Sequence, residues 1–568
     1  RNIQAFVDGK RVGLRMFYAP VPAIERIAFR TGVPRTFPTV DTPADQTYDL
    51  PNAGDQEPLA EYRIANVKTS SVDKDATAAV LKYADFSHYA DYFNGMEDEN
   101  IAQAIPNAKA SEWMEENIPL FECPQRNFEE MYYYRWWSLR KHIKETPVGY
   151  GMTEFLVQRS YSDKYNLIAC AIGHHIYESR WLRDPKYLDQ IIHTWYRGND
   201  GGPMNKMNKF SSWNADAVLA RYMVDADKDF MLDMKENLEA EYQRWECTNR
   251  LQNGLYWQGD VQDGMEESIS GGRKKKYARP TINSYMYGNA KALSLMGILS
   301  DDEGMAMRYG MRADTLKRLV QDKLWNSRHQ FFETMRADSS ANVREAIGYI
   351  PWYFNLPDTV KQYEVAWKEI MDENGFSAPY GLTTAERRHP EFRTHGVGKC
   401  EWDGAIWPFA SAQTLTAMAN FMNNYPQRVL SDSVYFRQME LYVESQYHRG
   451  RPYIGEYLDE VTGYWLKGDQ ERSRYYNHST FNDLMITGLI GLRPRLDDTV
   501  EVNPLIPADK WDWFCLDNVL YHGRNLTILW DKYGDRYHRG KGLRIFVDGK
   551  QVGYADRLTR IICENVLK

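Results

Sequence analysis

The chain has 568 residues, 43% of them hydrophobic and 26% charged, a balance that permits a sizeable core and excludes intrinsic disorder. The formal net charge of -8 argues against a nucleic-acid partner, because phosphate contacts require clustered lysine and arginine. Aromatic residues make up 14% of the chain, and their rings stack on the C–H faces of sugars, so composition favours a carbohydrate partner, with core packing as the alternative for any single ring.

Residues 1–110 are predicted to form strands, turns and loops. The segment NIQAFVDGKRVG alternates apolar and polar residues around an Asp-Gly turn, which is typical of a β-hairpin. A nearly identical segment, LRIFVDGKQVG, occurs at Leu543–Gly553 and predicts a second hairpin. No fixed period links the two copies, so a solenoid is not predicted. Pro34–Glu57, rich in Pro, Thr and Asp, predicts an extended linker.

Residues 111–492 show a helical period. Apolar residues recur at i, i+3, i+4 and i+7 in FEEMYYYRWWSLRKHI, KYLDQIIHTWYR, DKDFMLDMKENLEAEYQRWE, GMAMRYGMRADTLKRLVQDKLW and VKQYEVAWKEIM. Helices joined alternately by short turns and long loops predict a mainly α fold, an (α/α)6 toroid of helical hairpins, whose long loops gather at one end and form the site. Residues 493–568 alternate like strands again and predict a C-terminal β-sandwich.

Two acidic segments of the helical region are candidates for catalysis. DGMEES occupies Asp263–Ser268, and IGEYLDEVTG occupies Ile454–Gly463 among aromatic and apolar neighbours. Hydrolysis of a glycosidic bond needs two carboxyl groups that face each other across the substrate, and a fold that joins these segments would supply them. The alternatives are a helix N-terminus that attracts acids for the first segment and a solvated acidic loop for the second.

Four segments resemble motifs of clan G glycosidases, which include trehalases, processing α-glucosidases and mannosylglycerate hydrolases. DGMEES resembles "S-G-M-D-[ND]-[SAY]", CEWDGAIWP resembles "W-x-G-x-[IV]-W-P", and GEYLDEVTG resembles "E-x-Y-[ND]-x-x-T-G". DLMITGLIGLRP, followed by VEVNPLIP, resembles the junction to the β-sandwich in (α/α)6 enzymes. The resemblance covers roughly residues 120–535 and implies an inverting glycoside hydrolase.

The resemblance puts the general acid at Glu266 and the general base at Glu456. The clan usually has Asp at the acid position, and the extra methylene of Glu266 moves the carboxyl group about 1.5 Å outward. Asp263 and then Glu267 are therefore kept as alternative acids. Inversion implies that the two carboxyl groups lie about 6.5–9.5 Å apart, with room for one water molecule.

Further residues are candidates for contact with the sugar, each with helix capping or core packing as the alternative. In EWDGAIWP, the two tryptophans offer stacking rings, and the aspartate offers an acceptor for vicinal hydroxyl groups. The adjacent histidines 174 and 175 point about 100° apart on a helix, so at most one of them enters a pocket. The predicted binding residues are Trp402, Asp403, Trp407, Trp213, Asp216, Asn283, Tyr287, His174 and Trp257.

These patterns predict an exo-acting, inverting glycoside hydrolase that releases a terminal sugar from an oligosaccharide or from a plant or complex glycan. The alternatives are a glycoside phosphorylase, a sugar epimerase or lyase on the same toroid, and a non-catalytic glycan-binding protein. No cofactor is expected, since no His, Cys and Asp cluster has the spacing of a catalytic metal site; a structural calcium ion is left open.

The remaining sequence signals concern the compartment of the protein. The six cysteines are scattered and expected to be free and buried, and no apolar run approaches the roughly 20 residues of a membrane span. A periplasmic or extracellular location is expected, with the cytoplasm as the alternative. The chain begins at Arg1 and not at Met, so the sequence does not decide whether an export signal has been removed. The sequence does not indicate an oligomeric state.

Overall fold

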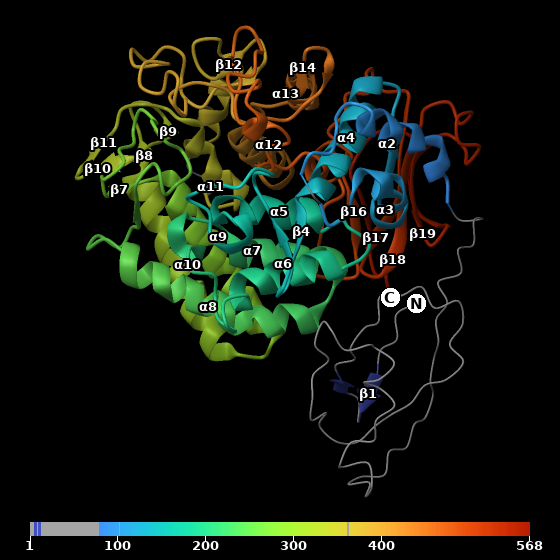
Figure 1. Cartoon of the computed structure of the whole chain (residues 1–568), viewed down its shortest axis with the longest axis horizontal. Helices are drawn as coiled ribbons and strands as arrows, with labels where there is room; N and C mark the ends of the chain where they lie inside the picture. Colours follow the sequence, from blue (N-terminus) through green and yellow to red (C-terminus); the bar gives the residue numbers. More distant parts are fainter. Residues whose placement is uncertain (1–4, 8–9, 13–78, 102, 360–362) are drawn as a thin grey trace, which may run out of the picture. The chain divides into compact units, whose positions relative to one another are not determined.

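The computed structural model describes residues 5–7, 10–12, 79–101, 103–359 and 363–568 (Figure 1). The chain divides into two compact units, Arg1–Ala76 and Thr77–Lys568. In the first unit, β1 (Ala5–Val7) pairs antiparallel with β2 (Lys10–Val12), which confirms the predicted hairpin. The predicted linker Pro34–Glu57 lies outside the described residues.

Helices of the second unit alternate between an inner and an outer ring. The inner ring consists of α5 (Ile172–Ser179), α7 (Asn214–Asp225), α9 (Pro280–Leu299), η6 (Ala346–Tyr349) with α11 (Ile350–Tyr353), α12 (Pro408–Asn424) and the π-helical η9 (Leu484–Leu489). The outer ring consists of α4 (Arg126–His142), α6 (Lys186–Arg197), α8 (Lys228–Asn249), α10 (Glu303–Lys323), η7 (Tyr363–Ile370) and α13 (Asp432–Ser445). Consecutive inner members pack on one another, and Glu178 of α5 accepts the backbone N–H groups of residues 481–483, directly before η9. This closure confirms the (α/α)6 toroid.

The sequence pattern explains the two rings. In outer helix α6, Leu188, Ile191, Ile192 and Trp195 are buried on one face, as the i, i+3, i+4, i+7 period requires. Inner helix α9 is buried on almost all sides, and a Cβ at Gly288 would lie only 2.3 Å from the Phe354 ring. Inner helices therefore approach one another closely, and their contacts form the core of the unit.

The region before the toroid differs from the prediction. Residues 79–109 contain η1 (Tyr83–Asp85), α2 (Ser87–Asn94) and η2 (Asn107–Lys109), where strands and loops were expected, whereas α3 (Ala110–Asn117) lies at the start of the predicted helical region. The physical reason is that Tyr89 and Phe93, one helical turn apart, bury their rings against Tyr133 and Tyr134 of α4. A helix of only 8 residues is too short for its period to be recognised in the sequence.

Strands dominate after the toroid. A five-stranded sheet has the order β20-β19-β18-β17-β3, formed by β20 (Lys550–Ala555), β19 (Gly542–Val547), β18 (Arg524–Asp531), β17 (Trp513–Tyr521) and β3 (Leu120–Glu122). A two-stranded sheet pairs β16 (Val500–Val502) with β21 (Ile561–Cys563). The second predicted hairpin is present as β19–β20, and its turn residues Asp548 and Gly549 have φ of 47° and 77°, as a type I′ turn requires.

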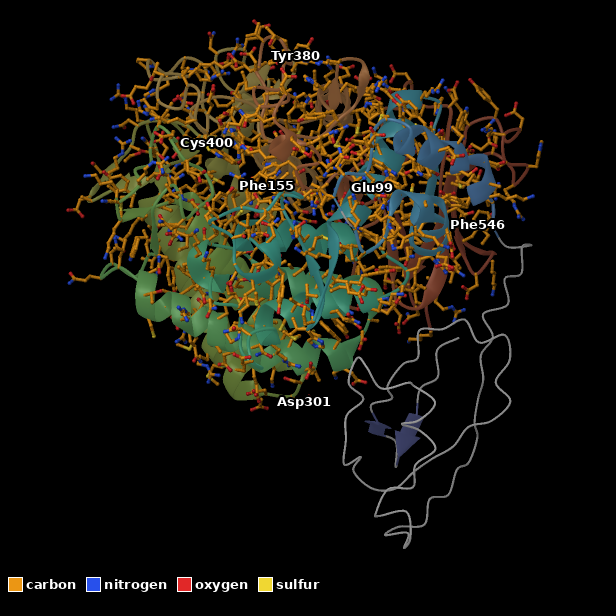
Figure 2. The ribbon with its side chains drawn as sticks, in the orientation of Figure 1. Glu99, Phe155, Asp301, Tyr380, Cys400 and Phe546 are labelled. Carbon is orange, nitrogen blue, oxygen red and sulfur yellow. The ribbon has the colours of Figure 1, made fainter. Side chains whose placement is uncertain are left out.

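Short strands occupy the long loops of the toroid. They are β4 (Ile143–Thr146), β5 (Gly149–Met152), β6 (Trp257–Gln258), β7 (Tyr277–Ala278), β8 (Trp325–Asn326), β9 (Phe331–Phe332), β10 (Met335–Arg336), β11 (Ser339–Ser340), β12 (Ser377–Ala378), β13 (Gly381–Leu382), β14 (Tyr447–His448) and β15 (Arg451–Pro452). Short 3₁₀ turns are η3 (Lys164–Asn166), η4 (Ala169–Ala171), η5 (Met207–Lys209) and η8 (Glu471–Ser473). In Figure 2, loop residue Tyr380 and Asp301, at the end of α9, lie at opposite ends of the unit. DGMEES lies between β6 and β7, and the second acidic segment follows β15.

All six cysteines are unpaired, as expected, although Cys247 is exposed and Cys400 is half-buried. Among the residues that the structure describes, no helix combines the length and the apolar character needed to cross a bilayer.

Candidate active site

Glu266 lies in the loop between β6 and β7, and its side chain is half-buried. The loop turns sharply here, since Gly264 and Glu267 both have positive φ, 73° and 67°. Burial is the main cause that raises the pKa of Glu266, the nearby carboxylates Asp260 and Glu456 add to the rise, Arg273 opposes it, and the resulting pKa is about 7. A carboxyl group with this pKa keeps its proton up to neutral pH, which is what a general acid requires.

Glu456 is only 3% exposed and is held by two cations. Lys467 Nζ lies 3.3 Å from Oε2, and Arg472 places a guanidinium nitrogen 2.9 Å from Oε1. These contacts favour the negative charge that a general base carries before it accepts a proton. Because Glu456 acts electrostatically on the pKa of Glu266, the fold brings the two predicted acids to one site.

The segment around Lys399 connects the two acidic loops. Lys399 Nζ is 3.9 Å from Oε2 of Glu267, the neighbour of the predicted acid. The backbone oxygen of Lys399 accepts a hydrogen bond from the hydroxyl of Tyr457, the neighbour of the predicted base. Three segments far apart in sequence therefore form one face of the site.

Three stacked rings line this face. Trp402 stacks on Trp407 with ring centroids 4.3 Å apart, and Trp407 stacks on Tyr457 at 4.5 Å. Both indole N–H groups are buried without a hydrogen-bond partner among the described residues. This stack, which adjoins Glu456, offers aromatic faces for sugar C–H groups and two donors for hydroxyl groups.

Asp263, the second-ranked acid, belongs to the scaffold of its loop. Its Oδ2 accepts hydrogen bonds from Arg279 Nε at 2.9 Å and from the Thr281 hydroxyl, and its Oδ1 accepts one from the Ser211 hydroxyl. The Asp263 and Arg279 side chains are both fully buried. This arrangement anchors the loop and leaves Asp263 no route to a substrate, while Glu267 is paired with Arg273 at 2.7 Å.

Two predicted sugar-binding residues instead hold backbone in place. Oδ2 of Asp403 accepts the N–H groups of His395 and Gly396, at 2.6 and 3.0 Å, and the side chain is fully buried. Asn283 exchanges hydrogen bonds with the backbone of Tyr256 and is also fully buried. Both polar side chains therefore stabilise the backbone of loops near the predicted site by hydrogen bonds.

Four more predicted residues pack within the helical rings. Trp213 is fully buried and makes ring contacts with His174, whose nitrogens have no partner among the described residues and whose pKa is lowered by burial. Asp216 of α7 accepts a hydrogen bond from Tyr177 at 2.7 Å. Tyr287 of α9 is buried, with its hydroxyl facing the charges of Asp314 and Asp358. No contact in this part of the molecule joins Asp216 or Tyr287 to either predicted acid.

Trp257 lies in β6 at the start of the loop that carries Glu266, and it is half-exposed. Lys276 Nζ lies 4.6 Å from the centre of its ring, a cation–π contact. The neighbouring basic residues 273–276 are exposed.

Sequence reasoning missed Glu154 and the two cations of Glu456. Glu154 is 2% exposed, and its charge interacts with those of both Glu266 and Glu456. Its surroundings, GMTEF, carry no motif, so no local signal could have identified it. Lys467 and Arg472 lie in the charged loop LKGDQERSR, and this run of charges beside a predicted base was an available signal.

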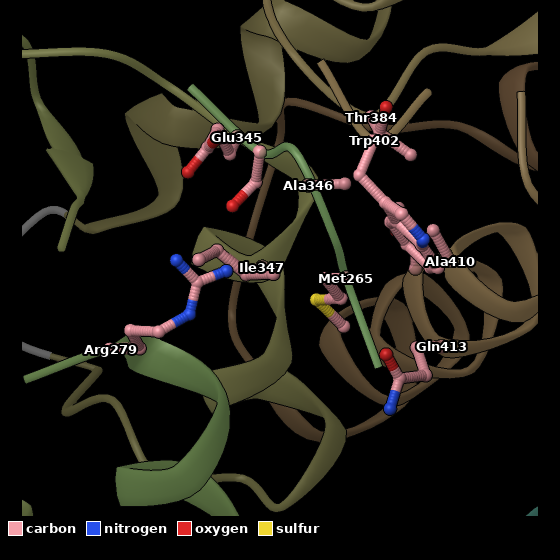
Figure 3. A pocket seen from close by; sticks show the side chains of 11 residues that line it. Met265, Arg279, Glu345, Ala346, Ile347, Thr384, Trp402, Ala410 and Gln413 are labelled. Carbon is pink, nitrogen blue, oxygen red and sulfur yellow. The ribbon is translucent and has the colours of Figure 1, made fainter. Parts of the chain in front are cut away.

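A small hollow lies behind the acid loop (Figure 3). It contains about 300 Å³ of space outside the atoms and is lined by Met265 and Ser268 of that loop, by Trp402, and by Arg279 and Glu345. Trp402 thus belongs both to the lining of the hollow and to the aromatic stack. Within the described ranges, no group of three or more His, Cys, Asp or Glu side chains is arranged to hold a metal ion.

Two family descriptions match the described unit. "Mannosylglycerate hydrolase MGH1-like glycoside hydrolase domain" matches residues 164–479, and "Glycosyl hydrolase family 65, C-terminal domain" matches residues 492–553. A third, "Sialidase-like, CBM domain", matches residues 1–46, most of which the structure does not describe.

Solved structures extend the comparison. A structure titled "Sialidase" is 90% identical with a TM-score of 0.86, over 100% of this chain and 52% of that one, so the chain spans about half the length of that protein. A GH78 family rhamnosidase of a Bacillus species is 10% identical with a TM-score of 0.53, over 76% of this chain and 41% of that one, and supports the fold alone. A GH63 mannosylglycerate hydrolase from Thermus thermophilus is 13% identical with a TM-score of 0.44, over 55% of this chain and 90% of that one, a likeness too weak to carry an argument.

The first family match includes both predicted acids and the aromatic stack, and it covers more than half of the 568 residues. The chain therefore belongs to the mannosylglycerate hydrolase MGH1-like glycoside hydrolase domain family.

Proposed function

We propose that this chain is an exo-acting, inverting glycoside hydrolase, with Glu266 as general acid and Glu456 as general base. The observation that carries the proposal is the electrostatic proximity of a carboxyl group with a pKa of about 7 and a carboxylate held by two cations. The first can give a proton to the leaving oxygen, and the second can take one from an attacking water molecule.

The enclosure of the site supports exo action. Glu456, Trp402 and Trp407 are each no more than 3% exposed, and the Lys399 segment bridges the two acidic loops. A pocket closed in this way accepts the end of a glycan more readily than the middle of a long polymer. The terminal sugar would lie on the stacked rings with its glycosidic oxygen toward Glu266.

Inversion is proposed from the resemblance to clan G and from the charge states of the two acids. A single displacement needs a protonated acid and an ionised base on opposite faces of the sugar, about 6.5–9.5 Å apart. A retaining enzyme would instead use the second carboxylate as a nucleophile, about 5 Å from the first.

The substrate is proposed to be a plant or complex glycan outside the cytoplasm. The match of residues 1–46 to a sialidase-like carbohydrate-binding domain supports a periplasmic or extracellular location. No step of the proposed reaction uses a cofactor.

The test is a screen of p-nitrophenyl glycosides, including pyranosides and arabinofuranosides, and of plant glycan fragments, in phosphate-free buffer. Proton NMR of the first product formed should show inverted anomeric configuration. Glu266→Gln and Glu456→Gln should each lower kcat by at least about 10²-fold, whereas Glu267→Gln serves as the neighbouring control. Retained configuration, dependence on phosphate, or near-wild-type turnover in either variant of the pair would contradict the proposal.

A further inference from the structure

Glu154 is a buried carboxyl group that the proposed reaction does not use. It follows β5, and each of its two side-chain oxygens accepts a hydrogen bond. Cys170 Sγ donates to Oε2 at 3.1 Å, and the Tyr476 hydroxyl donates to Oε1. Its backbone oxygen also accepts the N–H group of Asn477 at 2.9 Å. Glu154 is therefore fixed in position from three sides.

The two side-chain partners of Glu154 lead to the two acidic loops. Cys170 lies against the acid loop, since a Cβ at Gly264 would be 3.5 Å from the Cys170 Cβ. Tyr476 donates its N–H group to the backbone oxygen of Ile454, two residues before Glu456, at 3.3 Å. The Glu154 carboxyl group thus contacts Cys170, which lies against the loop of the proposed acid, and Tyr476, which is bonded to the segment of the proposed base.

The charges around Glu154 are mostly negative. Burial is the main cause that raises the pKa of Glu154, the charges of Glu456 and Glu266 add to the rise, Tyr476 and Cys170 oppose it, and the resulting pKa is about 7. Among the residues that the structure describes, the hydrogen-bond partners of the Glu154 carboxyl group are the uncharged Tyr476 and Cys170. The groups that act on the pKa of Glu154 are Tyr476, Cys170, Glu456 and Glu266, and Glu154 in turn acts on Tyr161. The main side chains that act on the pKa of Glu266 are Asp260, Arg273 and Glu456, and the charge of Glu266 in turn acts on Glu154, Cys170, Lys209 and Cys400.

We propose that Glu154 is a third acidic residue of the site, a positioning residue that ties the acid loop to the base segment and whose negative charge makes Glu266 hold its proton more firmly. The inference rests on the proposed roles of Glu266 and Glu456. Two like charges in one enclosed site disfavour simultaneous ionisation, so the loss of a proton from one acid strengthens the hold of the other on its own. Glu154 would thus extend the pH range over which the general acid stays protonated.

A direct titration tests the inference without requiring turnover. Protein labelled with ¹³C at glutamate carboxyl groups is titrated by NMR, and the Glu266 signal is assigned from its loss in Glu266→Gln. In Glu154→Gln, removal of the like charge should lower the Glu266 midpoint by about half a pH unit or more. The alkaline limb of kcat/KM should move in the same direction, which a merely structural role would not cause.

Glu241→Gln is the matched control. Glu241 of α8 is also a buried carboxyl group that accepts a hydrogen bond from a tyrosine, Tyr196, but it has no interaction with Glu266. Its replacement should leave the Glu266 midpoint unchanged. If Glu154→Gln does not fold, Tyr476→Phe replaces it, because loss of this donor favours the protonated Glu154 and should also lower the Glu266 midpoint.

The possible results separate the two proposals. An unchanged Glu266 midpoint in folded Glu154→Gln, or in Tyr476→Phe, overturns the inference, even if Glu266→Gln and Glu456→Gln abolish hydrolysis and so support the proposed function. A lowered midpoint in a protein that hydrolyses no glycan supports the electrostatic link and overturns the proposed function instead.

Discussion

Shortening the proposed acid tests how strictly the site fixes its position. Glu266→Asp withdraws the carboxyl group by about 1.5 Å. The loop cannot follow, because Asp263 is held by Arg279 and Thr281 in a fully buried cluster. A displacement of about 1 Å costs up to roughly 10²-fold in rate, so kcat/KM should fall by about that factor on substrates with poor leaving groups. Glu266→Gln, which has no proton to give, should lose between about 10² and 10⁴.

The assay compares aryl glycosides whose leaving groups differ in acidity. A 2,4-dinitrophenyl glycoside leaves without protonation, whereas an unsubstituted phenyl glycoside depends on the acid. Both variants should therefore approach the wild-type rate on the first substrate and fall furthest behind on the second. Glu267→Gln, a change at the adjacent carboxylate, should show no such trend.

Two results would refute this reasoning. Equal loss on every leaving group would mean that Glu266 positions the substrate and does not protonate the leaving oxygen. Wild-type rates in Glu266→Asp across the whole series would place the acid elsewhere.

Further predictions concern pH, stability and binding. The kcat/KM of the wild type should fall above pH 7, because a Glu266 whose pKa is raised to about 7 loses its proton there, and a profile that stays level well above neutrality would contradict this. Asp263→Asn should lower the free energy of unfolding by about 3–5 kcal/mol, measured by urea denaturation, because it leaves the buried Arg279 without its counter-charge; a loss below about 1 kcal/mol would speak against an anchoring role. Trp407→Ala should raise KM about tenfold, because the middle ring supports the two outer rings of the stack, and Trp407→Phe should recover part of the affinity, whereas equal KM values in all three proteins would show that the stack does not contribute to binding.

Periodicity and turn chemistry predicted the helical architecture well. The segments with a clear helical period became the outer helices, and α6 has the one buried and one solvated face that this period predicts. Outer helix α4 differs, since all its residues from Met131 to His142 are buried. The Asp548–Gly549 pair forms the turn of the β19–β20 hairpin because glycine accepts the positive φ of the turn, and β1 pairs antiparallel with β2 as the first copy of the pattern predicted. The proximity of the two predicted acids was predicted from their motifs, because helix and strand periods do not indicate which distant segments of a chain meet.

The roles of individual polar residues were harder to predict. Asp403 and Asn283 stand in the motif regions, yet the structure uses them to hold backbone N–H and C=O groups. Residue type alone does not distinguish a carboxylate that binds a sugar hydroxyl from one that binds a backbone N–H group, because both partners are hydrogen-bond donors. Glu154 was missed for the opposite reason, since only the folded chain brings it to Cys170 and Tyr476.

Strand β3 has a consequence for biosynthesis. Leu120–Glu122 precede every helix of the toroid, yet their partner strand begins only at Trp513. The backbone N–H groups of Val80 and Leu81 likewise bind the carboxylate of Asp517, at 2.6 and 2.8 Å. On the ribosome, the backbone hydrogen-bonding groups of these early segments stay unpaired until residues 513–521 have emerged, about 400 residues later. Nascent chains stalled before residue 513 should therefore be protease-sensitive around residue 120 and recruit chaperones, and synthesis past β17 should end both.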